Sequence, residues 1–360
     1  MRIINFFQSR LNILIYSCVA ALISFLFFIS TRAGVAESAG GHGTLAYYFA
    51  ITSHSFRYLA EGLAGLGALA IMAFVSASLI RNFMNVASGR KEPPLMIGSA
   101  TVVGSLKNGV RRVGAFLIEL MPAIIFVVVM SFLLDGMNAV DRTRLMDIGL
   151  LSFEHGIFGI YGFAYFGSLA YPLWLIKFII FSFENVSGIL FAAAFLIGIF
   201  KSPLLREYVA AFCLAMLLAV PLWFAFPAMS PQDRFIDDVY RLPITPQIEA
   251  AVAAYHPDAP ISAFLTSIRT GKGGLADMPT STMPSAHTAW AVLAGYYLFR
   301  ARKWLGWVAL PLLIASTMGT VILAQHYMTD VAIGLVISAL SIWLVSVVAQ
   351  MDAKSKTSRV

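Results

Sequence analysis

Long runs of hydrophobic positions, broken by shorter polar segments, form the main pattern of this chain. A helix needs about 20 predominantly apolar residues to cross the hydrocarbon layer of a bilayer. The pattern therefore predicts an all-α, polytopic membrane protein with about eight transmembrane helices. The predicted spans are Leu11–Ser30, Tyr58–Ile80, Gly114–Leu134, Pro172–Phe200, Tyr208–Phe226, Ala286–Phe299, Leu305–Ala324 and Asp330–Ala349.

Two of these spans leave alternatives open. The run Ala286–Phe299 is short, and it reaches the length of a span only if Thr288, Ala289 and Trp290 lie within the membrane. The stretch from Phe158 to Phe200 is long enough to hold one tilted helix or two helices.

The composition supports a membrane protein. Hydrophobic residues make up 59% of the chain and charged residues 12%, and the mean hydropathy is +0.81, which is too apolar for a protein with an aqueous surface. The net charge is +7, but the cationic residues are scattered over short polar segments, which argues against a nucleic-acid-binding protein. Cys18 and Cys213 each lie inside an apolar run, so neither a disulfide framework nor a zinc site is predicted.

The distribution of charge predicts the orientation of the chain. If the N-terminus is cytoplasmic and one helix lies between Asp135 and Lys201, most of the 25 Lys and Arg residues fall inside and most of the 18 Asp and Glu residues fall outside. The turn Arg300–Lys303 is then cytoplasmic. We interpret the first run as a signal anchor and expect an integral protein of the bacterial inner membrane or an equivalent membrane.

This pattern divides the chain into three parts. Residues 1–112 hold two transmembrane helices and a basic cytoplasmic segment, which is either a surface helix with a turn or a plain loop. Residues 113–350 form a six-helix membrane core, and residues 351–360 form a cytoplasmic tail. The core carries two extracytoplasmic loops: residues 135–171 alternate glycine with aromatic residues and are expected to form an interfacial cap, and residues 227–284 are rich in proline.

A histidine and a carboxylate stand together at the start of the last apolar run. His326 and Asp330 are four residues apart, which on a helix places their side chains on the same face. Asp330 could accept a hydrogen bond from one imidazole nitrogen and leave the other nitrogen to attack an electrophile. We therefore expect His326 to be a nucleophile oriented by Asp330. Gly334, one further turn along, would allow a neighbouring helix or a substrate to approach this face.

A second polar motif, Met283–His287, leads into another apolar run. Proline does not continue a preceding helix, and serine is a favoured N-cap, so Ser285 is expected to begin a helix. The free backbone N–H groups of a helix start suit a phosphate oxygen. His287 lies in the first turn and could protonate a departing oxygen, so the two motifs together predict chemistry on a phosphate ester.

Phosphate binding also requires fixed positive charge. Arg234 is the preferred candidate because it follows the fifth apolar run closely, and Arg241 is the second. Arg269 and Lys272 are the remaining cations considered for the same role.

The two motifs resemble the second and third signature motifs of the type 2 phosphatidic acid phosphatase superfamily. Trp290, the run Gln325–Tyr327 and the element Pro231–Arg234 are similar to its inositol-phosphorylceramide-synthase-like (aureobasidin-target-like) branch. The resemblance covers roughly Gly114 to Ala349.

The resemblance implies a six-helix catalytic core that works through a phosphohistidine without a metal or another cofactor. It implies that His326 is the nucleophile, Asp330 its partner, His287 the general acid and Ser285 a phosphate ligand. The chain departs from the superfamily in its first signature, where the usual lysine and Arg-Pro pair are missing. A further departure is Thr320, which stands where an arginine is common.

Together these features predict a membrane lipid phosphotransferase or phosphatase. The expected reaction transfers a phospho-headgroup from a phosphate-bearing lipid to a lipid or polyol alcohol at the extracytoplasmic face. The alternatives are a simple lipid phosphate or isoprenoid (di)phosphate phosphatase and, outside enzymes, a lipid transporter or scramblase with the same fold. Membrane lipids are expected partners, and nucleic acid is not.

Overall fold

The computed structural model describes residues 9–32, 114–130, 133, 145–239, 241–272 and 281–357 of the chain. In this part of the chain every regular element is a helix, and the only β-type pairing there is an isolated bridge between Ala228 and Ser281. The predicted all-α class is therefore confirmed for the described residues. The predicted span Tyr58–Ile80 lies outside them.

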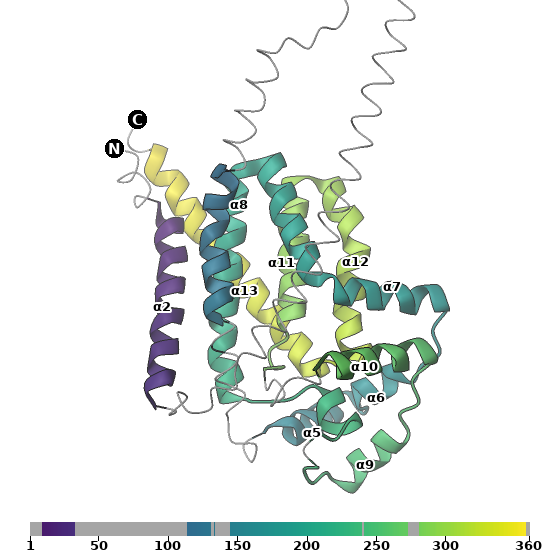
Figure 1. Ribbon diagram of the computed structural model, residues 1–360. Coiled ribbons are helices and arrows are strands. Elements are labelled where there is room, and N and C mark those ends of the chain that lie inside the picture. Colours follow the sequence, from purple (N-terminus) through teal and green to yellow (C-terminus); the bar gives the residue numbers. More distant parts are fainter. Residues whose placement is uncertain are drawn as a thin grey trace, which may run out of the picture.

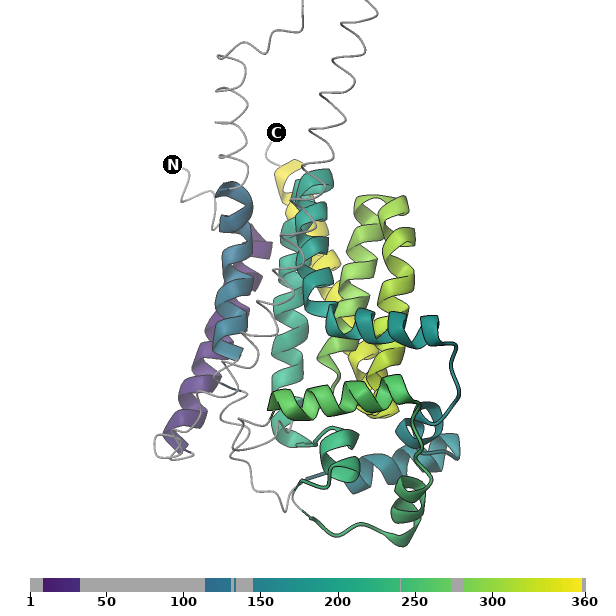
Figure 2. The ribbon, with the colours of Figure 1, turned by 45° about the vertical axis from the view of Figure 1, so that its right-hand side comes forward.

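Most of the long helices form a bundle whose members run along one common direction (Figures 1 and 2). Helix α11 lies in its middle and packs against α8, α12 and α13, and α2 covers α8 and α13 on one side. The members of the bundle are α2 (Arg10–Arg32), the helix Gly114–Met130, α8 (Val186–Ala225), α11 (Ala286–Ala301), α12 (Lys303–Ile322) and α13 (Met328–Thr357).

Three described helices are long and apolar enough to cross a membrane, namely α8, α12 and the Met328–Ser355 part of α13. Large apolar side chains on the bundle are exposed, as expected of surfaces that face lipid: Trp307 is 65% exposed and Trp343 61%. These features indicate an integral membrane protein. The predicted number of eight spans is not confirmed.

The remaining helices are short: α7 (Leu173–Glu184) crosses the bundle beside α12, and the others lie towards one end of the bundle (Figure 2). Helix α7 lies within the predicted span Pro172–Phe200, and the others occupy parts of the two long segments that the sequence predicts to be extracytoplasmic loops. These helices are α5 (Asp147–Phe158), α6 (Gly162–Gly167), α7 (Leu173–Glu184), the π-helical turn η2 (Gln232–Ile236), α9 (Pro246–Ala253) and α10 (Ala259–Lys272).

The predicted single span Pro172–Phe200 is wrong, because two helices meet at Asn185. The side-chain amide of Asn185 donates to the carbonyl of Phe181 at 2.8 Å, and its backbone N–H donates to the same oxygen at 3.1 Å. An asparagine that bonds the backbone in this way competes with continued helix formation. Helix α7 therefore ends at Glu184 and turns away from the direction of the bundle (Figure 1).

Helix α8 consists of two halves. The backbone leaves helical geometry at Lys201, with φ −156° and ψ 68°, so residues 186–200 and 202–225 are separate helical segments. Pro203 lies in the first turn of the second segment, where its missing N–H costs no helical hydrogen bond. The sequence places a polar turn at this point, between the runs Pro172–Phe200 and Tyr208–Phe226.

Buried apolar side chains form two clusters, one inside the bundle and one beneath the short helices. The first cluster includes Trp223 and Tyr297, and the second includes Phe163, Phe183 and Tyr327. Both histidine motifs lie where the two clusters meet, because Met283 and Tyr327 belong to the second cluster while Ala286 and Trp290 pack against the first.

Candidate active site

The structure brings the two motif histidines together. His287 lies in the first turn of α11, and His326 lies in the short connection between α12 and α13. Their ring centroids are 5.8 Å apart, and the ring planes are inclined by 60°. A single phosphoryl group could therefore contact both rings at once.

His326 is held through Nδ1. This nitrogen lies 3.0 Å from the carbonyl oxygen of Thr282 and 3.3 Å from Oδ2 of Asp330. Both neighbours are acceptors, so Nδ1 carries the proton and the lone pair of the neutral ring lies on Nε2. This is the tautomer required for attack through Nε2.

The contact between His326 and Asp330 does not arise on one helical face as expected. His326 precedes α13, which begins at Met328, and its backbone N–H donates to the carbonyl of Thr320 at 2.8 Å. Asp330 lies in the first turn of α13, is fully buried, and accepts from the backbone N–H of Tyr327 at 2.9 Å. The carboxylate thus caps the start of α13 and orients the imidazole at the same time.

Ser285 is the N-cap of α11, as the sequence predicts. Its backbone is extended at φ −69° and ψ 109°, and its Oγ accepts from the N–H of Thr288 at 3.3 Å. Its own N–H donates to the backbone carbonyl of Asp330 at 3.0 Å, which ties the start of α11 to the start of α13. Ser285 is fully buried.

Gly334 allows the close approach that the sequence predicts. A Cβ atom at this position would lie 2.7 Å from the carbonyl oxygen of Ser285 and 3.2 Å from Cβ of Thr288. A side chain there would separate α13 from the start of α11. The glycine therefore helps to set the distance between the two motifs.

His287 is packed among aromatic rings. Phe183 of α7 stacks on it with a centroid distance of 4.6 Å and an interplanar angle of 4°, and the ring of Trp290 lies 5.6 Å away at an angle of 35°. Sequence reasoning did not identify Phe183, because one aromatic residue in an apolar run carries no local signal of this contact.

The two candidate arginines differ in their surroundings. Arg234 is buried, and its guanidinium donates to the backbone carbonyls of Leu242 and Pro243 at 3.2 and 2.9 Å. Arg241 is exposed and has a positive φ of 49°. The hydrogen bonds of Arg234 thus run to the loop after Arg241 rather than to the histidines.

The segment that contains Arg234 connects the two histidine motifs. The N–H of Gln232 donates to the carbonyl of Ala324 at 2.9 Å, and the side chain of Gln325 donates to Oε1 of Gln232 at 2.7 Å. The hydroxyl of Thr282 donates to the carbonyl of Ala228 at 3.0 Å. The residues that precede Ser285 and His326 are therefore both bound to this one segment.

Two buried carboxylates of α5 lie beside the His326 connection. Burial raises the pKa of Asp147 to about 6, although hydrogen bonds from Tyr327 and Met229 and the nearby charge of Arg234 act in the opposite direction. Burial likewise raises the pKa of Glu154. Neither residue belongs to the predicted site, because α5 and the motif are far apart in sequence.

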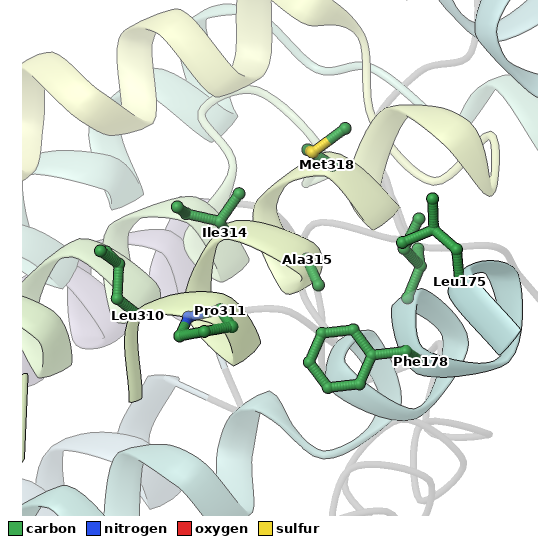
Figure 3. A pocket seen from close by; sticks show the side chains of 8 residues that line it. Leu175, Phe178, Leu310, Pro311, Ile314, Ala315 and Met318 are labelled. Atoms are coloured by element: carbon green, nitrogen blue, oxygen red, sulfur yellow. The ribbon is translucent and has the colours of Figure 1, made fainter. Parts of the chain in front are cut away.

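An apolar groove of about 310 Å³ lies between α7 and α12. Figure 3 shows Leu175 and Phe178 of α7 on one side, and Pro311, Ile314 and Met318 of α12 on the other. Helix α7 continues from this groove to Phe183, which stacks on His287. The groove and the histidine pair are therefore connected by one short helix.

Comparison with known protein families supports the resemblance seen in the motifs. Residues 173–344 match the family model of the PAP2 superfamily. The matched region contains Phe183, Ser285, His287, His326 and Asp330. Neither the curated proteins nor the solved structures give a match.

Proposed function

We propose that this protein is a membrane enzyme that cleaves a lipid phosphate ester, with His326 as the nucleophile. The observation that carries the proposal is the convergence of two imidazoles at 5.8 Å, one of which has its Nδ1 held by two acceptors. The match to the PAP2 superfamily supports a phosphatase-type activity on lipid phosphates.

In the first step, Nε2 of His326 attacks phosphorus and the bond from phosphorus to the ester oxygen breaks. Protonated His287 donates its proton to the departing alkoxide, which leaves as an alcohol. Asp330 stabilises the positive charge that develops on the His326 ring. The product of this step is a phosphohistidine at His326.

In the second step, the oxygen of water or of an alcohol attacks phosphorus and the bond from nitrogen to phosphorus breaks. His287 takes the proton from the attacking oxygen, which restores both histidines. Water gives a phosphatase, and a lipid or polyol alcohol gives a phosphotransferase. The superfamily match favours the first outcome, and the motif resemblance to the inositol-phosphorylceramide-synthase-like branch favours the second.

The start of α11 suits the phosphoryl oxygens. Backbone N–H groups at a helix N-terminus carry partial positive charge and bind anions. His287 belongs to the same turn, and Ser285 begins it. We assign the negative charge of the transferred group to this turn, with the hydroxyl of Ser285 as a ligand once it leaves its capping bond.

A fixed cation completes the proposed phosphate site, and Arg234 is better supported than Arg241. Arg234 is buried and close enough to Asp147 and Tyr327 to affect their pKa values, and Tyr327 is adjacent to His326. A guanidinium has five N–H donors, so two carbonyl partners leave donors for a phosphate oxygen. Arg241 would have to move its exposed side chain towards the site.

The groove between α7 and α12 suits the hydrocarbon part of a lipid substrate. Its lining is apolar, and the helix that forms one side ends beside His287. A phosphate at the histidines would therefore place an attached alkyl chain along α7. This arrangement favours a lipid phosphate over a soluble phosphate ester.

The expected orientation of the site is extracytoplasmic. The turn Arg300–Lys303, the start of α2 and the end of α13 lie at one end of the bundle, and the histidine motifs lie at the other (Figure 1). Cytoplasmic ends of membrane helices are enriched in Lys and Arg. We therefore propose that the histidines face the outer leaflet.

The test is to incubate the purified protein with phosphatidic acid or a labelled phospholipid in detergent micelles, with and without an alcohol acceptor. We expect loss of the phosphate ester in wild type, no inhibition by EDTA, and a loss of about three orders of magnitude or more in His326→Asn. Free phosphate as the sole product excludes the transferase. The scramblase alternative would be favoured if neither wild type nor His326→Asn cleaves the lipid and both move lipids between the two leaflets of vesicles.

A further inference from the structure

The short helix α5 carries two carboxylates that are removed from water. Asp147 is 1% exposed and Glu154 is fully buried. They are seven residues apart, which is about two helical turns and places both on one face of α5. Burying carboxylates is unfavourable unless they are well hydrogen-bonded, so their partners are informative.

Both carboxylates bind the residues that follow His326. The hydroxyl of Tyr327 donates to Oδ1 of Asp147 at 2.8 Å. The backbone N–H of Met328 donates to Oε2 of Glu154 at 2.8 Å. Tyr327 and Met328, the two residues that follow His326, are therefore each bound by one carboxylate of α5.

Asp147 is also connected to His326 by a second series of hydrogen bonds, which runs through Met229 and Thr282. Its Oδ1 accepts from the backbone N–H of Met229 at 2.8 Å. The hydroxyl of Thr282 donates to the carbonyls of Ala228 and Met229, and the carbonyl of Thr282 accepts from Nδ1 of His326. The contacts form a closed path from Asp147 through the segment at Met229 to the imidazole and back through Tyr327.

Glu154 joins the same connection to the start of α6. Its Oε1 accepts from the backbone N–H of Gly162 at 2.5 Å. A Cβ atom at Gly162 would lie 2.6 Å from Met328, so the two loops are already in close contact. Both oxygens of Glu154 thus accept hydrogen bonds from backbone donors.

We propose that Asp147 and Glu154 are positioning residues for the nucleophile. These two carboxylates fix the position and the orientation of the His326 ring relative to the ring of His287. Neither carboxylate contacts the reacting group. They act through Tyr327, Met328 and the carbonyl of Thr282. The rate measurements that test this inference rest on the proposed function. The spectroscopic measurement of the His326 tautomer depends only on the geometry of the contacts.

The hydrogen bonds predict different responses to amide substitution. Asp147 uses one oxygen for both donors, and its Oδ2 has no hydrogen-bond partner in the described chain. The amide of Asp147→Asn can keep both bonds through its oxygen. In Glu154→Gln, one backbone N–H must face the new NH₂ group, because both oxygens of Glu154 accept from backbone donors.

The experiment uses the full chain in detergent micelles and measures release of inorganic phosphate from phosphatidic acid. We expect kcat to fall about 10- to 100-fold in Asp147→Ala and Glu154→Gln with little change in KM, since small displacements of a catalytic group have effects of this size. Asp147→Asn should recover most of the rate lost in Asp147→Ala. Glu249→Gln, at an exposed position of α9, is the matched control and should behave as wild type.

Two further measurements keep the inference testable if the alanine variant does not fold or the probe is not turned over. Tyr327→Phe removes only the hydroxyl donor to Asp147 and should lower kcat, as Asp147→Ala does. In protein labelled with ¹⁵N-histidine, the His326 signals should show the Nδ1–H tautomer in wild type and in Asp147→Asn, and a mixture of tautomers in Glu154→Gln.

The outcomes separate the two proposals. A tautomer shift in Glu154→Gln without any phosphate release by wild type would uphold the positioning role and contradict the proposed substrate. Unchanged kcat and an unchanged His326 tautomer in Glu154→Gln would overturn the positioning role. An equal loss of rate in Glu249→Gln would overturn it as well.

Discussion

The orientation of His326 depends on a backbone atom as much as on a side chain. The carbonyl of Thr282 lies closer to Nδ1 than Asp330 does, at 3.0 Å compared with 3.3 Å. Asp330 is in turn fixed by its bond to the N–H of Tyr327. The ring is therefore held by two acceptors that come from different segments of the chain.

At the residue scale, local motifs predicted some of the contacts within the candidate site. The N-cap role of Ser285 follows from residue type within a few positions. The sequence also predicted the contact between His326 and Asp330, although His326 precedes α13 rather than sharing a helical face with Asp330. Thr282, Phe183 and Asp147 could not be found in this way, because they meet the histidines only through long-range packing. A carbonyl acceptor also has no signature in the sequence, since every residue carries one.

Gly334 provides a prediction about the distance between the two motifs. In Gly334→Ala, the new Cβ would lie 2.7 Å from the carbonyl of Ser285, so α13 and the start of α11 must move apart. We expect kcat for lipid phosphate cleavage to fall about 10- to 100-fold. Gly114→Ala is the control, because a Cβ there meets nothing within 4 Å. Wild-type kcat in Gly334→Ala would contradict the close approach.

Asp147 provides a prediction about pH. Its pKa is raised to about 6 in the folded protein, so its neutral form stabilises the fold below pH 4 and this contribution is lost as the pH rises through about 6. The groups that face it are the hydroxyl of Tyr327, the N–H of Met229 and the charge of Arg234.

Asp147→Asn removes this titration. Relative to wild type, the variant should gain stability on the order of 2–3 kcal/mol between pH 4 and pH 7. Thermal midpoints measured in detergent at several pH values check the slope. Parallel curves for the two proteins, or a relative loss of stability in the variant as the pH rises, would contradict the raised pKa.

At the scale of elements, the polar residues between apolar runs decide where helices end. Asn185 ends α7 through its bonds to the carbonyl of Phe181, and Lys201 interrupts α8. Hydropathy predicted one helix across Asn185, because a single polar residue barely changes the average of a long apolar window. The direction of α7, which brings Phe183 to His287, could not be predicted for the same reason.

The ends of the two terminal helices are joined by a cap. The carboxylate of Asp352 in α13 accepts from the hydroxyl of Ser9 at 2.8 Å and from the backbone N–H groups of Arg10 and Leu11 at 2.9 and 3.2 Å. It thus caps the start of α2 from a helix at the other end of the chain.

Asp352→Ala should lower the free energy of unfolding by about 1 kcal/mol, the usual effect of losing an N-cap. Lys354→Ala, at an exposed position of the same helix, is the control. Denaturant or thermal unfolding in detergent measures both. An equal effect of the two substitutions would show that the cap does not stabilise the contact between α2 and α13.

At the scale of the whole molecule, the histidine motifs and the basic turn Arg300–Lys303 lie at opposite ends of the bundle (Figure 1). The sequence predicted this separation correctly, because one apolar helix lies between each motif and the turn. It could not establish the number of spans: α8, α12 and α13 have the length and composition of spans, and Tyr58–Ile80 lies outside the described residues.

The orientation in the membrane gives a prediction for cysteine labelling. Cys18 and Cys213 are buried, so single introduced cysteines can be followed over a low background. In intact cells, a membrane-impermeant maleimide should label His256→Cys, whereas Lys303→Cys should react only after permeabilisation. Both positions are exposed in the structure. The reverse pattern would place the histidines on the cytoplasmic side.

The central claim is that His326 forms a covalent bond to phosphorus during turnover. Rapid quenching into base after mixing with ³²P-labelled phosphatidic acid, followed by peptide mapping, tests it directly, because phosphohistidine survives alkali. We predict label on the peptide that contains His326 in wild type and in Glu249→Gln, and none in His326→Asn. Turnover of the lipid without label at His326, or with label on another residue, would contradict the account.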